Sequence, residues 1–388
     1  MSQALDDVRL TVPPVVISGV NLTEGGPLTV LRDCLAAARS VLDPEQTIIA
    51  VVHDRRLFSQ AGVQFVEIPK AKSSWRHRLA VEYLEFKRLS QHWRPALWLS
   101  LHDASPLLAA GTPQAVYCHN STPFFKFRLK DLWFEPKLLI FHLFYGLIYR
   151  FNLSSNALVI VQQDWLRAMF QRRFKAGKVL VAHPSVNDLT IDEHPQLSRS
   201  GTILLFPTLS RAFKNIETIC QAYVEASRNG FVGELRVTID GTENRYARFI
   251  ARRFGAVPGI KLIGRQDRDA MAARYRECTA VLFPSRLETW GLPITEAIGF
   301  DKPLLVADLP YARETVGAYD KALFLPASDW RQWGQAILEL GKTEFTPTNT
   351  APLSPAAPFV TGWVAAWVYL GDEFALPMRH DPTASVAD

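Results

Sequence analysis

Two glutamates that lie close together in the sequence could do chemistry on a shared ligand. Glu288 and Glu296 flank the segment TWGLPIT, and the apolar run at 280–283 before them is typical of a buried parallel strand. Pro293 suits the first position of a helix that ends near Gly299. Both carboxylates are then expected at the carboxyl end of a strand, where α/β sheets bind ligands and helix N–H groups attract anions. The alternative is structural, because carboxylates at a helix start also stabilise its dipole.

A pair of basic residues follows another predicted strand, at 201–209. Arg211 and Lys214 lie just before a helix expected from about Ile216 to Asn229. Two cations at the N-terminus of a helix suit a pyrophosphate group. Arginine and lysine on a surface are more often only solvated, so this pair does not define a site without further support.

The first half of the chain carries weaker signals. Gly25 and Gly26 follow the first predicted strand, where they let backbone N–H groups approach a phosphate or sugar, but Gly-Gly-Pro is common in ordinary turns. The dinucleotide fingerprint GxGxxG follows the first strand of neither half. His119 comes directly after the predicted strand at 114–118, and a histidine in such a place is more often structural than functional.

The elements that must position these residues alternate along the chain. Strands are predicted at 12–20, 46–53, 96–101, 114–120, 157–164 and 178–186, then again at 201–209, 234–241, 260–264, 280–285 and 302–308. Helical patterns separate many of them, and two successive βαβ series predict an α/β protein with two doubly wound parallel sheets.

The domain organisation follows from the restart of this alternation. We predict an N-terminal domain over 1–190 and a second domain over 198–345, with the junction in the polar segment 187–200. Residues 346–388 are predicted to form a linker rich in Pro, Thr and Ala and a helix that docks on the protein.

Composition limits the class of protein. The chain has 388 residues, of which 48% are hydrophobic and 21% charged, as in a globular protein of two domains. The four cysteines form no CxxC pair, which indicates a reducing compartment and argues against structural zinc. The first residues are polar rather than a secretory signal, and the apolar run 138–149 is too short to span a bilayer. These features predict a cytoplasmic protein.

Positive charge is concentrated in the first half of the chain. Residues 1–185 contain 22 Lys and Arg against 14 Asp and Glu. Much of the excess lies in 124–137 and 165–178, where basic and aromatic residues flank the apolar run. This pattern fits an anionic membrane surface, a nucleic acid or merely a solvated helix side. No nucleic-acid motif accompanies it, so the membrane surface is the functional interpretation that we favour.

Several sequence blocks resemble those of retaining glycosyltransferase family 4. They are ILLFPTLSRAFKNIETI, LRVTIDGTEN, the segment 260–297 and PLLVADLPYARETVG, with GGP and YCHNSTPFF near the amino terminus. The resemblance covers nearly all of the chain up to about residue 340, and its most specific element is the pair Glu288 and Glu296. The block that contains His119 is similar to those of bacterial surface-polysaccharide and lipopolysaccharide glycosyltransferases.

The resemblance implies a fold and an activity. The fold is GT-B, two Rossmann-like domains facing a cleft, and the activity is retaining transfer of a hexose from a nucleotide diphosphate sugar to a saccharide or lipid-linked acceptor. Glu296 would bind the ribose, Glu288 would face the donor sugar, and Arg211 and Lys214 would hold the diphosphate. His119 would approach the sugar from the first domain.

The resemblance also implies secondary donor contacts and a metal-independent reaction with no cofactor beyond the donor substrate. The additional donor-binding residues are Gly25, Gly26, Arg265, Trp290, Gly291 and Leu292. Two features depart from the family: Arg211 is only three residues before Lys214, and Trp290 replaces the usual phenylalanine. Asp267 and Asp269 look like a metal-binding Asp-x-Asp, but we interpret Asp267 as the N-cap of a helix.

Two other functions remain open. A sugar-nucleotide 2-epimerase shares the GT-B fold and would act on the donor without an acceptor. A protein that only binds a nucleotide sugar would keep the donor residues and lack turnover.

Overall fold

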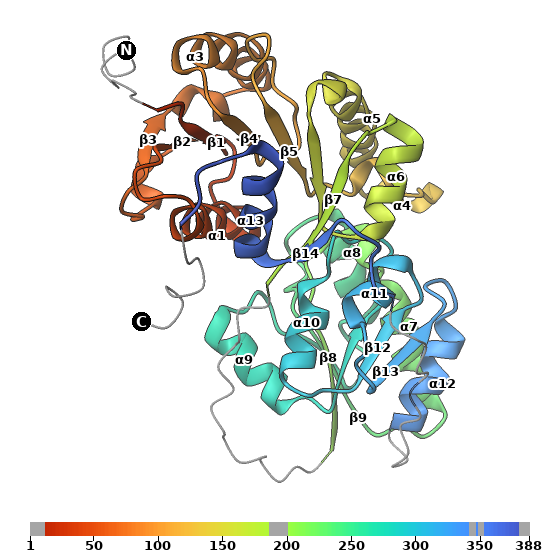
Figure 1. Ribbon diagram of the computed structural model, residues 1–388. Coiled ribbons are helices and arrows are strands. Elements are labelled where there is room, and N and C mark those ends of the chain that lie inside the picture. The colour runs from red at the N-terminus through yellow and green to blue at the C-terminus, as the bar shows by residue number, and fades with distance from the viewer. Residues whose placement is uncertain (1–11, 186–200, 341–346, 348–352, 380–388) are drawn as a thin grey trace. The chain divides into compact units, whose positions relative to one another are not determined.

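The computed structural model describes residues 12–185, 201–340, 347 and 353–379. The chain divides into two compact units (Figure 1). The first consists of Met1–Asn120, Phe144–Ser185 and Ala356–Asp388, and the second of Ser121–Leu143 and Val186–Pro355. The chain thus returns to the first unit at its end. The predicted junction at 187–200 lies entirely outside the described residues.

The first unit is built on a sheet of eight parallel strands in the order β14-β7-β6-β5-β4-β1-β2-β3. The strands are β1 (Val15–Ser18), β2 (Ile48–Val52), β3 (Gln64–Glu67), β4 (Leu97–Ser100), β5 (Gln114–Cys118), β6 (Leu158–Val161), β7 (Val179–His183) and β14 (Phe359–Thr361). Strands β1, β2, β4 and β5 are buried along their whole length, which explains why they consist mainly of apolar residues. The strand order changes direction between β1 and β4.

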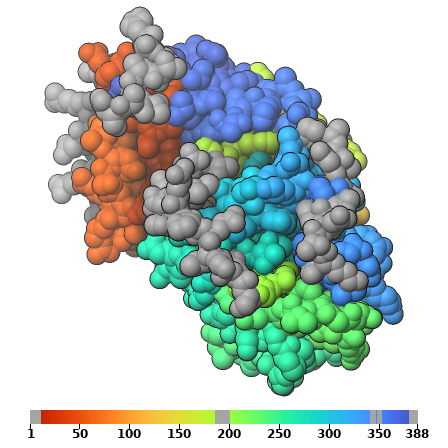
Figure 2. Space-filling model, turned by 90° about the horizontal axis from the view of Figure 1, so that it is seen from below, coloured from red at the N-terminus to blue at the C-terminus, as the bar shows by residue number. Residues whose placement is uncertain are grey.

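Helices cover this sheet. They are α1 (Gly25–Val41), α2 (Trp75–Ala80), α3 (Phe86–Trp93), α6 (Asp164–Phe174) and α13 (Gly362–Phe374). A turn of π-helix, Val81–Glu85, joins α2 to α3, so the helical pattern of this region is interrupted once. The C-terminal helix α13 packs on α1, where the indole Nε1 of the buried Trp367 donates to the carbonyl of Cys34 at 2.9 Å. Figure 2 shows this blue C-terminal segment beside the red and orange N-terminal part.

The second unit contains a sheet of six parallel strands in the order β10-β9-β8-β11-β12-β13. The strands are β8 (Thr202–Phe206), β9 (Gly233–Val237), β10 (Ile260–Leu262), β11 (Ala280–Phe283), β12 (Leu304–Ala307) and β13 (Ala322–Leu325). The helices are α4 (Leu129–Phe134), α7 (Ile216–Arg228), α8 (Arg245–Phe254), α9 (Arg268–Glu277), α10 (Leu292–Gly299), α11 (Pro310–Val316) and α12 (Trp330–Leu340). The strand order reverses between β8 and β11, which makes the loops after these two strands the expected ligand-binding edge.

One helix, α5 (Pro136–Arg150), has residues of both units. The two parallel α/β sheets confirm the predicted doubly wound fold class. None of the helices in the described part of the chain combines the length and the apolarity needed to cross a bilayer.

Candidate functional site

The centre of the candidate site is an ion pair between Lys214 and Glu288. Lys214 ends a short 3-10 turn after β8, Glu288 lies in the loop after β11, and Lys214 Nζ is 2.5 Å from Glu288 Oε1. Both side chains are mostly buried, with 13% and 14% of their surface exposed. Lys214 Nζ also lies 5.4 Å from the centre of the Phe283 ring. The reversal of strand order at β8 and β11 therefore brings together two residues that the sequence analysis singled out separately.

A buried asparagine fixes the turn that carries Lys214. Asn215 is fully buried with φ of 64°, a conformation that asparagine tolerates better than most residues. Its Nδ2 donates to the carbonyl of Ala327 at 2.7 Å and to that of Pro284 at 3.3 Å. The turn after β8 is therefore tied to the loop after β11. Asn215 was not among the predicted site residues, although its place directly before a predicted helix could have indicated it.

Arg211 does not share the carboxylate of Glu288 with Lys214, because it pairs with Glu135 instead. Its Nε lies 2.6 Å from Glu135 Oε1, and Glu135 Oε2 accepts a hydrogen bond from the N–H of Ala212 at 3.0 Å. Glu135 thus engages one cation and one N–H group, which are the groups that a phosphate would use. Arg211 remains 44% exposed. Glu135 could not be predicted as a site residue, because nothing in its local sequence connects it to residues so far along the chain.

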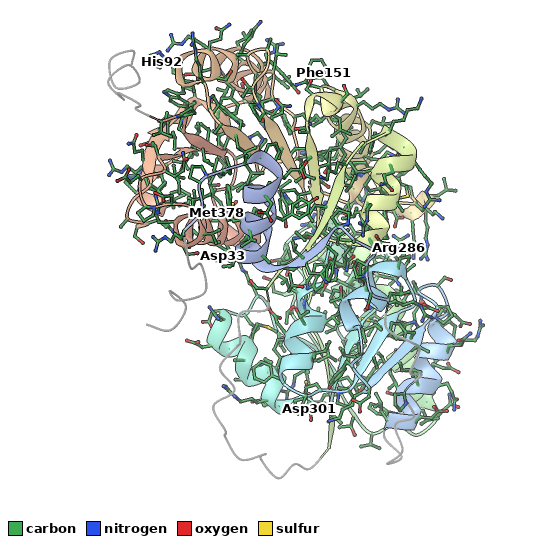
Figure 3. The ribbon with its side chains drawn as sticks, in the orientation of Figure 1. Asp33, His92, Phe151, Arg286, Asp301 and Met378 are labelled. Atoms are coloured by element: carbon green, nitrogen blue, oxygen red, sulfur yellow. The ribbon has the colours of Figure 1, made fainter. Side chains whose placement is uncertain are left out.

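Further ion pairs attach the segment Ser121–Leu143 to the rest of the second unit. Arg286 Nη2 lies 2.5 Å from Asp131 Oδ1, and both side chains are buried. Lys130 pairs with Glu217. Arg286, which Figure 3 labels, also donates its backbone N–H to the carbonyl of Phe213 at 2.8 Å. Arg286 therefore links the segment to the turn that carries Lys214.

Glu296 has a tyrosine partner. It lies in α10, and its Oε2 accepts a hydrogen bond from the hydroxyl of Tyr275 at 2.6 Å. Burial and the nearby charge of Glu296 raise the pKa of Tyr275 well above its ordinary value, so the hydroxyl remains a donor at neutral pH. The Tyr275 ring stacks on Phe300 with 5.3 Å between ring centres. This arrangement fixes one carboxylate oxygen of Glu296 and is compatible with ligand binding by the other.

The loop between the two glutamates has a conformation that requires glycine. Gly291 has φ of 94°, and a β-carbon there would lie 3.3 Å from Ile294 Cδ1. The carbonyl of the buried Trp290 accepts from Thr315 Oγ1 at 2.5 Å. Helix α10 begins at Leu292, so Pro293 occupies its second position rather than the first.

The loop after β10 carries Gly264 and Arg265. Gly264 has φ of 70°, and its N–H donates to the carbonyl of Ile239 at 3.0 Å. Asp267 Oδ1 accepts from the N–H of Ala270 at 2.9 Å, which confirms the predicted N-cap of α9.

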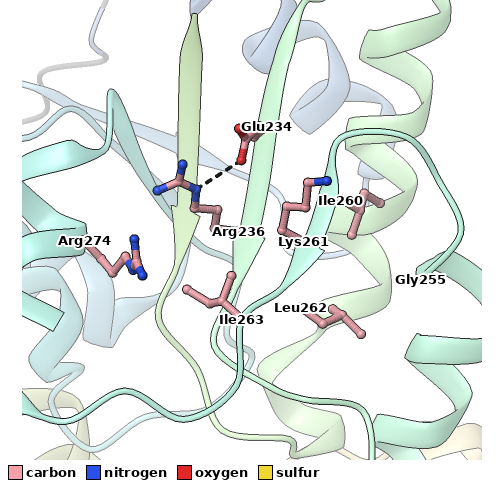
Figure 4. Close-up of a pocket in the computed structure, with 8 residues that line it drawn as sticks. All are labelled: Glu234, Arg236, Gly255, Ile260, Lys261, Leu262, Ile263 and Arg274. Atoms are coloured by element: carbon pink, nitrogen blue, oxygen red, sulfur yellow. Dashed lines mark hydrogen bonds and ion pairs between the residues drawn. The ribbon is translucent and has the colours of Figure 1, made fainter. Parts of the chain in front are cut away.

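A shallow cavity of about 520 Å³ lies elsewhere in this unit (Figure 4). It is lined by Glu234, Arg236, Gly255, Ile260, Lys261, Leu262, Ile263 and Arg274, so it includes none of the residues described above. Arg236 is already paired, with Nε 3.2 Å from Glu234 Oε2 and Nη1 2.6 Å from Glu277 Oε2. We assign no ligand to this cavity.

The first unit contains the remaining predicted residues. His119 follows β5, and its N–H donates to Asp103 Oδ1 at 2.7 Å, while its ring Nδ1 lies 3.7 Å from the same oxygen. The buried Asp103 has φ of 69° and also accepts from the hydroxyl of Tyr149 at 2.9 Å. Gly25 and Gly26 form the start of α1. Asp103 was not among the predicted site residues, although it follows β4 at the point where the strand order of this sheet reverses.

Residues 191–351 match the family of glycosyl transferases group 1. None of the curated proteins compared with the chain matches it. The match includes Lys214, Glu288 and Glu296.

Solved structures resemble nearly the whole chain. Lipopolysaccharide outer core galactosyltransferase WaaB, in its apo form, has a TM-score of 0.61 and 12% identity over 87% of this chain and 92% of that one. A glycosyltransferase from Rickettsia africae has a TM-score of 0.60 and 9% identity, covering 94% and 99%. Sucrose-phosphate synthase from Thermosynechococcus elongatus has a TM-score of 0.58 and 14% identity, covering 94% and 98%. Similarity at this level of identity confirms the GT-B fold. Together with the group 1 match it supports a glycosyltransferase.

Proposed function

We propose that the protein is a retaining glycosyltransferase of family 4. It transfers a hexose from a nucleotide diphosphate sugar to a saccharide or lipid-linked acceptor in the synthesis of a bacterial surface polysaccharide or lipopolysaccharide. The observation that carries the proposal is the Lys214–Glu288 pair, which lies inside the group 1 match and at the point where the strand order reverses. The class of acceptor rests on the resemblance of the sequence around His119.

The chemistry follows from the charges that develop in the reaction. When the bond between the sugar and the diphosphate breaks, negative charge grows on the leaving phosphate, where Lys214 and Arg211 stabilise it. Arg211 must exchange Glu135 for the phosphate to do so. Glu288, oriented by Lys214, contacts the donor sugar, and Glu296 accepts hydrogen bonds from the ribose.

Retention needs no protein nucleophile in this proposal. The acceptor hydroxyl forms the new bond to the anomeric carbon on the face that the phosphate leaves, and the leaving phosphate oxygen takes the hydroxyl proton. His119 contributes from the first unit as a group that contacts the donor sugar. Gly25, Gly26, Arg265 and the N–H groups of 290–292 complete the donor contacts.

The decisive experiment identifies the donor. Thermal unfolding is measured with each of the common nucleoside diphosphates, because a ligand at about 100 times its Kd stabilises the folded protein by about 2.7 kcal/mol. The sugars carried by the preferred nucleotide are then offered with saccharide acceptors, and the anomeric configuration of the product is determined by NMR. Inverted product refutes retention, and failure to bind any nucleoside diphosphate refutes the proposal.

Two controls separate the other functions. Incubation with the donor alone reveals a 2-epimerase if the sugar is converted at C2 without an acceptor. Donor binding that never leads to transfer or epimerisation, over a broad set of acceptors, identifies a binding protein. Either outcome would refute the proposed glycosyl transfer and assign the other function instead.

The proposed reaction is independent of metal ions, because the cations that face the leaving group are lysine and arginine. We expect turnover to persist after EDTA treatment. Loss of turnover in EDTA that Mn²⁺ or Mg²⁺ restores would overturn this part of the proposal.

We also propose that the protein acts at the inner face of the plasma membrane, where a lipid-linked acceptor would be found. The basic and aromatic segments of the first half of the chain support this location.

A further inference from the structure

Helix α5 exposes one continuous apolar face. Ile140, Leu143 and Leu147 are spaced three and four residues apart, and Phe151 follows at the same interval just after the helix ends. Their exposed fractions are 66%, 60%, 64% and 53%, which is unusual for large apolar side chains in successive helical turns. We call these four residues the α5 face. Figure 3 labels Phe151 at the outer edge of the first unit.

Aromatic contacts brace the part of α5 that belongs to the first unit. Trp75 of α2 meets Phe144 edge to face at 4.5 Å between ring centres. Tyr83, in the turn between α2 and α3, meets Phe151 at 4.7 Å. Such contacts add stability beyond simple burial, so they hold α5 against the preceding helices while the α5 face remains exposed.

The charges around the α5 face are positive. The helix PKLLIFHLFYGLIYR contains no Asp or Glu, and its exposed charged residues are Lys137 near the start and Arg150 at the end. Arg173 of α6 lies beside the middle of the helix, since a β-carbon at Gly146 would be 3.8 Å from its Nη2. The carboxylate that directly precedes the helix is engaged, because Glu135 pairs with Arg211.

An apolar stripe bordered by cations complements the headgroup region of a bilayer that contains anionic lipids. Apolar side chains enter the boundary between headgroups and acyl chains, and nearby Lys and Arg side chains are attracted by the negative surface potential of the membrane. A helix of 15 residues is about 22 Å long, shorter than the roughly 30 Å of a hydrocarbon core, which suits a helix that lies in the membrane surface.

We propose that the α5 face is a membrane-docking surface that inserts into an anionic lipid bilayer, with Lys137, Arg150 and Arg173 contacting the lipid phosphates. This inference deepens the membrane contact of the proposed function by naming the surface that makes it. It does not depend on which sugar is transferred.

The test is sedimentation of the full-length protein with vesicles. One set is made of phosphatidylcholine alone and the other of phosphatidylcholine mixed with phosphatidylglycerol. We expect binding to the anionic vesicles that weakens with added salt. We also expect at least about a tenfold loss of affinity in the double variant Leu143→Glu/Leu147→Glu, because it removes two exposed apolar side chains that insertion into the bilayer would bury. Val232→Glu is the matched control, since Val232 is 83% exposed in a different part of the chain, before β9.

A charge variant tests whether the basic residues beside the α5 face contact the lipid phosphates. Arg150→Glu is expected to reduce binding to anionic vesicles severalfold, whereas Arg253→Glu, an exposed arginine of α8, leaves it unchanged. Thermal unfolding of every variant verifies that it folds.

Three results would overturn the docking surface. The first is that the folded protein does not bind anionic vesicles. The second is that Leu143→Glu/Leu147→Glu and Val232→Glu bind equally well. The third is a dimer in sedimentation velocity that the same double variant dissociates, which would assign the face to a second copy of the chain. Nucleoside diphosphate binding, measured without vesicles, reports separately on the proposed function. A variant that loses vesicle binding and keeps nucleotide binding supports the docking surface.

Discussion

Lys214 Nζ lies 2.5 Å from Glu288 Oε1, although 74 positions separate the two residues in the sequence. The pair forms because β8 and β11 are neighbours in the sheet and their following loops meet at the same edge. Each side chain fixes the other in a largely buried position, where charges interact more strongly than in water. A cation held in place before a ligand binds is suited to stabilise charge that develops during a reaction.

Replacement of Lys214 by methionine is expected to reduce kcat/KM about 10²- to 10³-fold, because it removes a fixed cation from the leaving phosphate. The measurement is steady-state kinetics with the donor identified by nucleotide screening. Thermal unfolding accompanies it, since Glu288 loses its partner in this variant.

The control for this variant is Lys321→Met, which removes an exposed lysine whose Nζ lies 2.5 Å from Asp301 Oδ2 in the same unit. We expect nearly unchanged turnover there. If Lys214→Met keeps the turnover of the wild type, Lys214 has no part in the reaction.

Glu135→Gln is expected to increase the affinity for nucleoside diphosphates about two- to fivefold, because a half-exposed ion pair of this kind is worth up to about 1 kcal/mol. The carboxylate of Glu135 competes with the ligand for Arg211 and for the N–H of Ala212. Isothermal titration calorimetry gives the two dissociation constants. Asp301→Asn serves as the control for loss of an acidic side chain.

Weaker binding by Glu135→Gln would have the opposite meaning. It would show that Glu135 orients Arg211 for the ligand instead of competing with it.

Glu296→Ala is expected to raise the donor KM about 10- to 100-fold with little change in kcat, since hydrogen bonds to a charged group contribute about 1.5–3 kcal/mol. Tyr275→Phe removes only the hydroxyl that orients the Glu296 carboxylate, so a rise of about two- to tenfold is expected. Tyr319→Phe is the matched control, because that hydroxyl donates to the carbonyl of Lys302, at 3.0 Å. A fall in kcat without a change in KM would contradict binding of the ribose by Glu296.

The sequence predicts the inner strands of both sheets because most of them are buried apolar runs between polar loops. It does not predict β3, β13 or β14. Strand β3 is mostly exposed, β13 is only half-buried, and β14 has three residues, none of them fully buried, so none of these strands carries the signal of a buried strand. These three strands lie at sheet edges, where burial constrains the sequence less.

The residues of the candidate site were likewise only partly predictable from the sequence. Lys214 and Glu288 could be selected because each follows a recognisable strand, and strand ends gather at one edge of a parallel sheet. Glu135 and Tyr275 could not be selected, because their roles arise from contacts that form only when distant segments fold together. Asp103 follows the strand predicted at 96–101 and meets the same criterion as Lys214 and Glu288. The sequence therefore indicates where charges gather, and the fold decides which partner holds each of them.

A buried carboxylate in the first unit gives a prediction for stability. Glu82 lies in the π-helical turn between α2 and α3, and its Oε1 accepts from Arg78 Nε at 2.8 Å and lies 3.2 Å from His102 Nδ1. Burial raises the pKa of Glu82, but the charges and hydrogen bonds of His102 and Arg78 outweigh burial and leave the pKa below its ordinary value. A group whose pKa is lowered by folding stabilises the folded state when ionised, and this contribution is lost as the pH falls through the folded-state pKa.

Glu82→Gln is expected to destabilise the protein by about 3–5 kcal/mol at neutral pH, because it leaves the buried Arg78 without its counter-charge. The difference from the wild type should begin to shrink as the pH falls below about 4, the ordinary range of a glutamate, and should vanish only below the lowered folded-state pKa, where protonated Glu82 is as neutral as glutamine. Thermal unfolding at a series of pH values measures this convergence. Glu85→Gln, three residues further along and only half-buried, should change stability by less than about 0.5 kcal/mol. Equal destabilisation of Glu82→Gln at every pH would mean that the shape of the side chain, and not its charge, holds this turn together.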